Sequence, residues 1–245
     1  MIRSDALTVH HGKTAVLWNL TFQVPKGVLL GILGPNGAGK STMLKTLMGL
    51  IRPLSGQIEC SGKIAYVPQR ESIDWDFPIT ALEVVMMGRF GKLGFFKRLR
   101  KADREAALIM LEQVGMKELA HRQINQLSGG QQQKLFIARA LMQEADVYLL
   151  DEPFAGVDLT TEKAIMEILK RQKEAGKTLL IVHHDLPTVR EYFDWVILLN
   201  RRLVACGPVK EVFNREHVQS TFRSPTLFDE VATLTAETYQ GEVIP

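Results

Sequence analysis

The 245-residue sequence has few cysteines, little net charge and no long apolar run. Cys60 and Cys206 are far apart and have no C-x-x-C spacing, which excludes a disulfide framework and predicts two buried thiols in a reducing compartment. The formal net charge of +3 is too small to indicate nucleic-acid binding. No apolar run approaches the ~18–20 residues of a membrane span, and the N-terminus has no apolar segment typical of a secretory signal. We therefore expect any link to a membrane to depend on a partner.

Hydropathy patterns predict an α/β fold. The stretches 6–11 and 16–24 alternate between polar and apolar residues and are rich in β-branched residues, which is typical of antiparallel strands. Short, continuous apolar runs predict strands buried on both faces. These runs are 28–33, 147–150, 178–183 and 196–199. Because helical patterns separate several of these runs, we expect a parallel sheet.

Apolar residues at helical spacing predict three long helices, and a shorter helix is expected near 186–193. The three sets are Ala107, Met110, Leu111 and Val114; Leu135, Ala138 and Met142; and Ile165, Ile168 and Leu169. Gly115 and Gly176 are expected to end the first and the third of these helices. We predict one domain, with a core of about 1–80 and 146–226, a helical insert over 81–145, and a tail over 227–245.

The stretch 34-GPNGAGKS-41 fits G-x-x-x-x-G-K-[ST] and lies between a predicted strand and a predicted helix. Its glycines would let backbone N–H groups surround a phosphate at the positive end of the helix. Lys40 would contact the β- and γ-phosphate oxygens, Ser41 would bind Mg²⁺, and Thr42 would add a donor. The predicted nucleotide-binding residues are Gly34, Pro35, Asn36, Gly37, Ala38, Gly39, Lys40, Ser41 and Thr42.

The run 147-VYLLDE-152 places two carboxylates at the end of a buried strand. Asp151 is a candidate magnesium ligand, and Glu152, which points elsewhere, is a candidate general base for the attacking water. A triphosphate site of this kind occurs in both NTPases and kinases, so these residues alone leave the two classes open.

Four further motifs resemble those of the ATP-binding subunits of ABC transporters, and the resemblance covers almost the whole chain. The motifs are the signature segment 127-LSGGQQQK-134, Gln69 in 67-VPQR-70, 155-AGVD-158 and the switch segment 182-VHHDL-186. The resemblance implies a P-loop NTPase core with a parallel sheet, an N-terminal antiparallel β subdomain and an inserted α-helical subdomain. A P-loop kinase has no need of the signature and switch segments.

The resemblance also implies roles for these motif residues. Ser128 is a natural N-cap, and together with Gly129, Gly130 and Gln131 it would bind the γ-phosphate of a partner's ATP. Gln69 would contact magnesium and the attacking water, which makes Ser41, Gln69 and Asp151 the predicted metal ligands. His184 would donate to the γ-phosphate, and Glu152, His184 and Gln69 are the predicted catalytic residues. Asp158 would communicate across a dimer.

Two features depart from the usual family pattern, and the adjacent histidines invite another interpretation. His11 stands where the family has an aromatic residue that stacks on adenine, and 155-AGVD-158 replaces the commoner SALD. The adjacent histidine pairs, 10–11 and 183–184, also suggest a metal site. Neighbouring residues of a strand point to opposite faces, so we expect neither pair to chelate a metal.

The region 68-PQRESIDWDFPITALEVVMMGRFGKLGFFKR-98 resembles the subunits that serve manganese, zinc and iron importers. The DWDFP and MMGR runs carry this resemblance, although they are also compatible with a rim loop and a core helix. Asp74 and Asp76 are expected to be interface or cap residues rather than metal ligands. A basic cluster is expected to be a solvated face. Its members are Lys97, Arg98, Arg100, Lys101 and Arg104.

The resemblance thus predicts an ATPase that uses ATP and Mg²⁺ and pairs head to tail with a second copy. Its other partners would be membrane permease subunits and, indirectly, an extracytoplasmic metal-binding protein, at the cytoplasmic face of the cell membrane. Nucleic acid is not an expected partner. Manganese is the favoured cargo, with zinc or iron as alternatives. An importer for another substrate, such as an iron chelate, and a non-transport ABC ATPase remain open.

Overall fold

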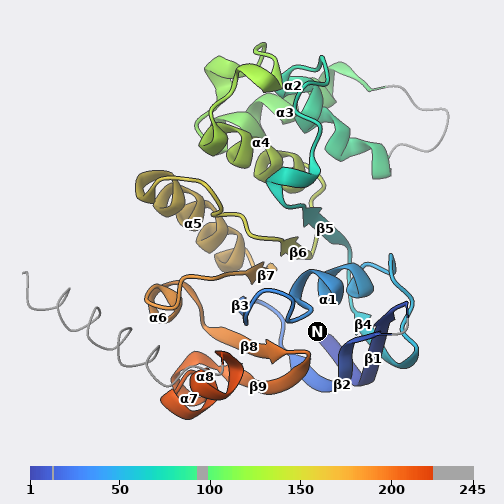
Figure 1. The fold of residues 1–245 in the computed structure, drawn as a ribbon. Coiled ribbons are helices and arrows are strands. Elements are labelled where there is room, and N and C mark those ends of the chain that lie inside the picture. Colours follow the sequence, from blue (N-terminus) through green and yellow to red (C-terminus); the bar gives the residue numbers. More distant parts are fainter. Residues whose placement is uncertain (13, 93–98, 223–245) are drawn as a thin grey trace, which may run out of the picture. The chain divides into compact units, whose positions relative to one another are not determined.

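The computed structural model describes residues 1–12, 14–92 and 99–222 of the chain (Figure 1). Of these, residues 1–61 and 180–222 form a first compact unit, and residues 62–179 form a second. The predicted tail and two members of the basic cluster, Lys97 and Arg98, lie outside the described residues.

An antiparallel sheet of three strands in the order β2-β1-β4 forms one part of the first unit. Its strands are β1 (Ile2–His11), β2 (Thr14–Val24) and β4 (Ser55–Cys60). Ile2, Leu7 and Val9 of β1 are fully buried because one face of the sheet packs on the core, and an irregularity in register between Ser4 and Leu7 keeps them on that face. The prediction of two antiparallel strands near the N-terminus is therefore confirmed.

The α/β part of the first unit is built around β3 (Leu29–Leu33), every residue of which is buried. β3 pairs in parallel with β8 (Trp195–Asn200), and β8 pairs antiparallel with β9 (Arg202–Pro208). The last three residues of β7 (Thr178–Val182), from Leu180 on, also belong to this unit. The helices of the unit are α1 (Lys40–Leu47), α6 (Val189–Tyr192), α7 (Val209–Val212) and α8 (Arg215–Phe222).

The second unit begins with two parallel strands, β5 (Ile64–Val67) and β6 (Val147–Leu150), in the register Ile64↔Val147. After β6 comes the long helix α5 (Leu159–Glu174), which buries Ile165, Ile168 and Leu169 as the apolar spacing predicts. With the parallel pairs in both units and the antiparallel N-terminal sheet, the predicted α/β class is confirmed.

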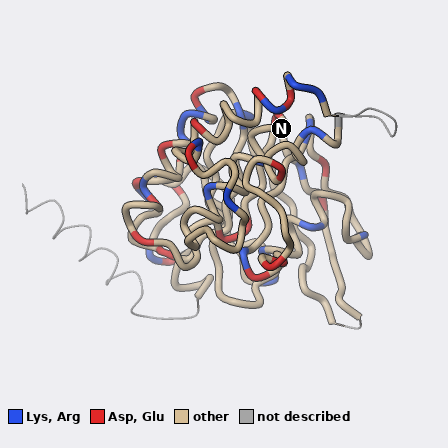
Figure 2. Tube along the Cα trace, turned by 90° about the horizontal axis from the view of Figure 1, so that it is seen from above, with Lys and Arg blue, Asp and Glu red and all other residues tan. Residues whose placement is uncertain are grey.

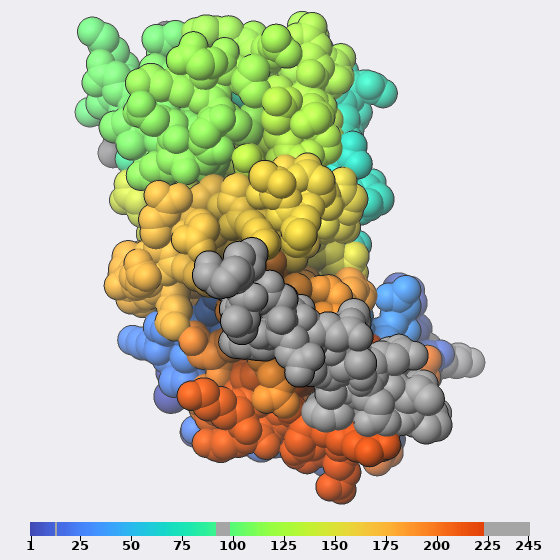
Figure 3. Space-filling view, turned by 90° about the vertical axis from the view of Figure 1, so that its left-hand side faces the viewer, coloured from blue at the N-terminus to red at the C-terminus, as the bar shows by residue number. Residues whose placement is uncertain are grey.

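The stretch between β5 and β6 is mostly helical. Its elements are η1 (Arg70–Ser72), α2 (Ala81–Met86), η2 (Met87–Lys92), α3 (Lys101–Gln113), η3 (Lys117–Leu119), η4 (Ile124–Gln126) and α4 (Gly129–Leu141). In the space-filling view the residues of α3 and α4, coloured green, form one continuous block (Figure 3). The three helices α2, α3 and α4 contact one another, so the predicted helical insert is a packed bundle.

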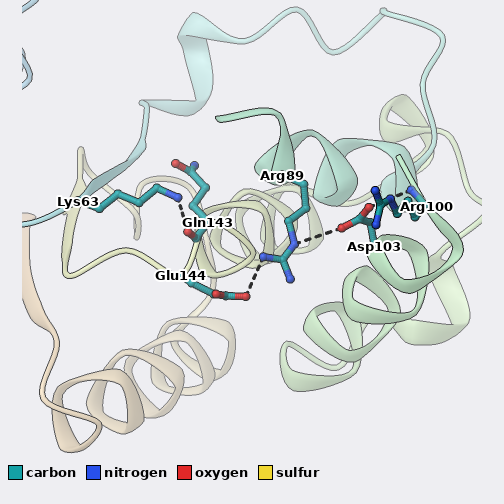
Figure 4. A network of polar contacts seen from close by, with 6 residues as sticks. All are labelled: Lys63, Arg89, Arg100, Asp103, Gln143 and Glu144. Carbon is teal, nitrogen blue, oxygen red and sulfur yellow. Dashed lines mark hydrogen bonds and ion pairs between the residues drawn. The ribbon is translucent and has the colours of Figure 1, made fainter. Parts of the chain in front are cut away.

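Arg89 joins three parts of this bundle (Figure 4). Its guanidinium lies 2.8 Å from the Glu144 carboxylate, after α4, and 3.6 Å from the Asp103 carboxylate in the first turn of α3. Beside Arg89, a Cβ on Gly88 would lie 2.5 Å from the carbonyl oxygen of Arg139. The MMGR run therefore has an internal packing role, because only glycine allows η2 to approach α4 this closely.

Charged residues of both signs alternate along the trace, as Figure 2 shows. Within the described part of the basic cluster, Arg100, Lys101 and Arg104 are exposed on or beside α3, where acidic residues alternate with them. This agrees with a solvated face. Among the described residues, no helix combines the length and hydropathy that a bilayer crossing requires.

Some features differ from the sequence prediction. β4, β5 and β9 were not predicted, and the helix expected near 186–193 is shortened to Val189–Tyr192. Cys60 and Cys206 do not form a disulfide, but both are partly exposed rather than buried.

Candidate nucleotide-binding site

The phosphate loop, residues 34–42, connects β3 to α1 in the first unit. Gly34 packs so tightly that a Cβ there would lie 1.9 Å from the carbonyl oxygen of Leu199, and Gly39 has a φ of 95°. Both positions therefore require glycine. Lys40 follows as the first residue of α1, where the N–H groups of the first turn have no intrahelical acceptor.

The Lys40 side chain folds back over the loop. Its ammonium group donates to the carbonyl oxygens of Gly34, at 2.8 Å, and Pro35, at 3.0 Å, and the residue is only 5% exposed. A buried cation that lies across the mouth of a glycine-rich loop and at a helix N-terminus suits the oxygens of a phosphate. Ser41 and Thr42 come next in the first turn of α1 and are partly buried.

His11 ends β1 at the first unit's N-terminal hairpin. It pairs with Thr14, the first residue of β2, and its side chain is exposed. The position leaves the imidazole available to a flat aromatic ring, and its role beside adenine stays a prediction.

In the switch segment the two histidines face opposite ways, as the strand geometry predicts. His183 continues β7: its N–H donates to the carbonyl oxygen of Ile32 on β3, and its ring is only 4% exposed. His184 is exposed. Among the described residues, no group of three or more His, Cys, Asp or Glu side chains could hold a metal ion.

The buried His183 ring has a defined partner that sequence reasoning missed. Nε2 lies 2.8 Å from the Thr188 hydroxyl oxygen, and that hydroxyl donates to the carbonyl oxygen of Asp185. The Thr188 hydroxyl thus contacts both the His183 ring and the backbone of Asp185, two residues further on. The ring closes the turn of residues 183–188 and so fixes the backbone from which His184 projects.

Burial lowers the pKa of His183 to about 4, although the nearby Asp185 carboxylate favours the charged form. The unfolded chain binds a proton at this histidine below a pKa of about 6.5, whereas the folded chain stays neutral down to about pH 4. Stability from this group is therefore fully present above pH 6.5 and is lost as the pH falls towards 4.

We expect the free energy of unfolding to fall by about 2 kcal/mol between pH 7 and pH 5 because of His183. Urea titrations of the wild type and of His183→Gln at both pH values measure the difference. The variant should lose this part of the pH dependence. Replacement of the exposed His121 by glutamine is the control and should retain it. An equal pH dependence in wild type and His183→Gln would contradict the assignment.

Asp151 follows β6 in the second unit and is 1% exposed. Its N–H donates to the carbonyl oxygen of Val67, and its Oδ2 accepts a hydrogen bond from the Tyr66 hydroxyl at 3.3 Å. Burial and the Asp151 charge raise the pKa of Tyr66, so the phenol keeps its proton and stays a donor. A carboxylate held by β5 and β6 is a hard oxygen ligand of the kind that magnesium prefers.

Glu152 leaves the strand with a φ of 54°, in the left-handed region that non-glycine residues rarely adopt. Its carbonyl oxygen accepts the N–H of Ala155, which stabilises this turn. The left-handed conformation redirects the side chain from the alternating pattern of β6, so Asp151 is buried while Glu152 is partly exposed. The two carboxylates thus have different surroundings, as different roles require.

Gln69 lies at the start of η1, directly after β5. Its carbonyl oxygen accepts both the hydroxyl, at 2.6 Å, and the N–H of Ser72. These bonds hold the backbone in a turn and leave the amide side chain partly exposed.

The signature segment forms the start of α4, and the predicted cap is confirmed. Ser128 Oγ accepts the Gln131 N–H, and the Gln131 side-chain oxygen accepts the Ser128 N–H, which makes a capping box. The Ser128 hydroxyl hydrogen remains available for an anionic acceptor. The N–H groups of Gly129 and Gly130 precede the first intrahelical bond, which runs from Gln132 to Ser128.

Two of these residues have internal constraints as well. A Cβ on Gly130 would lie 2.9 Å from Cγ2 of Thr161, so the helix start packs against α5. Gln131 was predicted to bind nucleotide, but its side-chain oxygen is used in the cap. Asp158 caps α5, because its carboxylate accepts both the N–H and the hydroxyl of Thr161. Hydrogen bonding to the Thr161 backbone lowers the pKa of Asp158.

The DWDFP run of residues 74–78 forms a surface turn. The Asp74 carboxylate accepts the N–H of Asp76, which fits a cap rather than a metal ligand. Phe77 is 57% exposed and Met87, in the MMGR run, is 39% exposed. Large apolar side chains that stay exposed in the second unit suit a contact with another protein.

The predicted site residues are therefore divided between the two units. The first unit brings together the phosphate loop and the switch segment, through the pairing of His183 with β3. The second unit holds Gln69, Asp151, Glu152 and the signature segment.

The chain is similar to known proteins. A family model described as "ABC transporter" matches residues 17–155. The manganese transport system ATP-binding protein MntB of Bacillus subtilis is 54% identical, over 90% of this chain and 92% of its own length. The zinc transport system ATP-binding protein TroB of Treponema pallidum is 50% identical, over 93% of this chain and 90% of its own.

Solved structures show the same fold. A structure described as an inward-facing, metal-chelate type ABC transporter is 30% identical with a TM-score of 0.85, and covers 91% of this chain and 89% of that one. A dimeric ATP-binding cassette in a post-hydrolysis state, bound to ADP and phosphate, is 29% identical with a TM-score of 0.76. It covers 85% of this chain and 99% of that one.

Proposed function

Because this chain belongs to the ABC transporter family, we propose that it is the ATP-hydrolysing motor subunit of a divalent metal-ion importer. The family assignment makes it an ATPase. The proposed cargo is manganese, with zinc or iron as alternatives, and rests on the relatives named above. The single observation that carries the cargo class is their identity of 50% and 54% over nine-tenths of the chain.

Each proposed catalytic element matches a feature of the fold. Lys40 exchanges its two carbonyl acceptors for phosphate oxygens when ATP enters the loop. Ser128, Gly129 and Gly130 offer a hydroxyl and two N–H groups to the γ-phosphate of a second copy's ATP. This hydroxyl and these helix N–H groups, together with the dimeric structure of a related cassette, support a head-to-tail pair.

Hydrolysis needs a base and a group that responds to the γ-phosphate. Glu152 takes a proton from the attacking water, and this residue is partly exposed, unlike the buried Asp151. His184 donates to the γ-phosphate as negative charge develops there. Because ATP contacts both copies only when they are closed, its binding favours the closed pair and its hydrolysis reopens it.

The site also fits Mg²⁺, which would be held by Ser41, Gln69 and Asp151. Their hydroxyl, amide and carboxylate oxygens are the hard donors that this ion prefers, and Tyr66 orients the Asp151 carboxylate. When bound, the ion would neutralise charge on the β- and γ-phosphates.

The proposed assembly contains two copies of this chain, membrane permease subunits and, indirectly, an extracytoplasmic metal-binding protein. Its place is the cytoplasmic face of the cell membrane. The exposed Phe77 and Met87 belong to the region that we assign to permease contact. An importer of an iron chelate is the second candidate, and the metal-chelate type transporter of similar fold favours it.

Uptake of radioactive manganese, zinc and iron tests the proposal in cells that lack the gene. We expect manganese uptake to be lost, to return with the wild-type gene, and to stay absent with a Glu152→Gln gene. Loss of zinc or iron uptake alone would reassign the ion, and loss of iron-chelate uptake would favour the second candidate. Unchanged uptake of manganese, zinc, iron and the iron chelate would contradict an import function.

A further inference from the structure

Arg70 follows Gln69 directly and reaches α4 with its side chain. Its Nε donates to Oε1 of Gln132 at 2.9 Å, and Nε2 of Gln132 donates to the carbonyl oxygen of Ile124 at 3.2 Å. Gln132 is only 4% exposed. Because a buried amide loses stability when either end is unsatisfied, its acceptor needs the Arg70 donor.

A second contact reaches α4 from the same segment. The carbonyl oxygen of Arg70 accepts Nε1 of Trp75 at 3.0 Å, and the Trp75 ring packs edge-on against the Phe136 ring, with centroids 5.3 Å apart. Gln132 and Phe136 are four residues apart, so they lie one above the other on a single face of α4.

The same face is contacted at its N-terminal end. A Cβ on Gly129 would lie 3.4 Å from Cζ of Arg70 and 3.6 Å from Nη1, so the guanidinium lies against the first turn of α4. Gly129 follows Ser128, which offers its hydroxyl to the partner's ATP in the proposed function. Arg70, which follows Gln69 in the chain, therefore lies against Gly129, which follows Ser128.

From these contacts we propose that Arg70 is a positioning residue that holds the Gln69 segment and the start of the signature helix in one fixed geometry. The proposal rests on the proposed function, because Ser128 must act on ATP for its position to matter. A displacement of the Gln69 segment is transmitted to Ser128 through the guanidinium and the Gln132 amide. In the proposed function Gln69 acts at the subunit's own ATP and Ser128 at the ATP of the second copy, so the two segments then engage together.

Replacement of Arg70 by methionine removes the donor and keeps much of the aliphatic stem. We expect kcat for ATP hydrolysis by the full-length subunit to fall about tenfold, because a misplaced catalytic group costs rate even when it is intact. The dissociation constant for ATP should be unchanged, since Lys40 and the phosphate loop belong to the other unit. Phosphate release and equilibrium dialysis with ATP measure the two quantities.

Arg89→Met is the matched control for lost stability. It removes another partly buried arginine of the same unit, whose partners are the Glu144 and Asp103 carboxylates at the far end of the bundle (Figure 4). The thermal unfolding midpoint should fall in both variants, whereas kcat should fall only in Arg70→Met. An equal loss of kcat in both would reduce Arg70 to a structural residue and overturn the proposal.

A double variant tests whether Arg70 acts through Ser128. If it does, Arg70→Met adds little to the loss of kcat that Ser128→Ala causes alone. Losses that multiply would mean independent roles and would overturn the proposal. If Ser128→Ala has no effect on hydrolysis, the proposed ATP pair fails first. If kcat is normal in Arg70→Met but low in Ser128→Ala, the positioning role of Arg70 is refuted and the proposed ATP pair stands.

Two substitutions of Gln132 decide the question if Arg70→Met does not fold. Gln132→Glu keeps an acceptor for Arg70 but loses the donor to the Ile124 carbonyl oxygen, so stability should fall while kcat stays well above that of Gln132→Leu. Gln132→Leu removes the acceptor, so kcat should fall as in Arg70→Met. Equal kcat values for the two Gln132 variants would overturn the proposal.

Discussion

We expect Glu152→Gln to lower the rate of ATP hydrolysis by about 10²–10⁴-fold, the usual contribution of a general base. The amide has nearly the shape of the carboxylate but cannot take a proton from water. ATP binding should be unchanged, because the phosphate loop lies in the other unit. With hydrolysis blocked, the ATP-bound pair of subunits should accumulate. Phosphate release measures the rate, and light scattering in the presence of ATP measures the pair.

Glu167→Gln is the control for this experiment. Glu167 is exposed on α5 in the same unit, where it pairs with Lys170 at 3.7 Å. Such a surface pair contributes little to stability, so hydrolysis should remain normal. If Glu152→Gln also hydrolyses ATP at the normal rate, the general base must be sought elsewhere.

The second large effect is expected at Ser128. Ser128→Ala removes a hydroxyl donor from the ATP of the second copy, and loss of one such donor costs about 10²–10³-fold in rate. ATP binding by the isolated subunit should be spared, because Ser128 would complete the partner's site rather than its own. The rate and the dissociation constant for ATP are measured as for Glu152→Gln.

The change at Ser128 also removes a helix cap, which costs about 1 kcal/mol of stability. Thr80→Ala is the matched control, because Thr80 caps α2 with the same kind of box, completed by Glu83. It should lose similar stability and keep normal hydrolysis. Loss of ATP binding by monomeric Ser128→Ala would show that the signature segment belongs to the subunit's own site.

The elements that were predicted correctly are those whose signal is local. The runs that became β3, β6, β7 and β8 are almost entirely apolar because these strands are buried on both faces. β4 and β9 are more exposed, and their residues take strand conformation by pairing with β1 and β8. That pairing is a tertiary effect, which an apolar pattern does not reveal.

The same distinction separates the site residues that were predicted from those that were missed. The phosphate loop and the cap at Ser128 are each formed by residues close together in the sequence, so a local motif predicts them. Tyr66 and Asp151 are 85 positions apart, and Arg70 and Gln132 are 62 apart, so only the fold shows that they meet. The cap role of Gln131 is the exception, because Ser128 and a glutamine three residues later form a recognisable local pattern.

The left-handed backbone at Glu152 has a consequence for how this protein can change. For a residue with a side chain, that conformation costs about 1–2 kcal/mol relative to the right-handed one, and glycine would occupy it without strain. At position 152, the residue that gives higher thermal stability therefore differs from the residue that hydrolysis requires. Selection for heat resistance alone would favour glycine there and would discard the base, whereas selection for transport retains a locally strained glutamate.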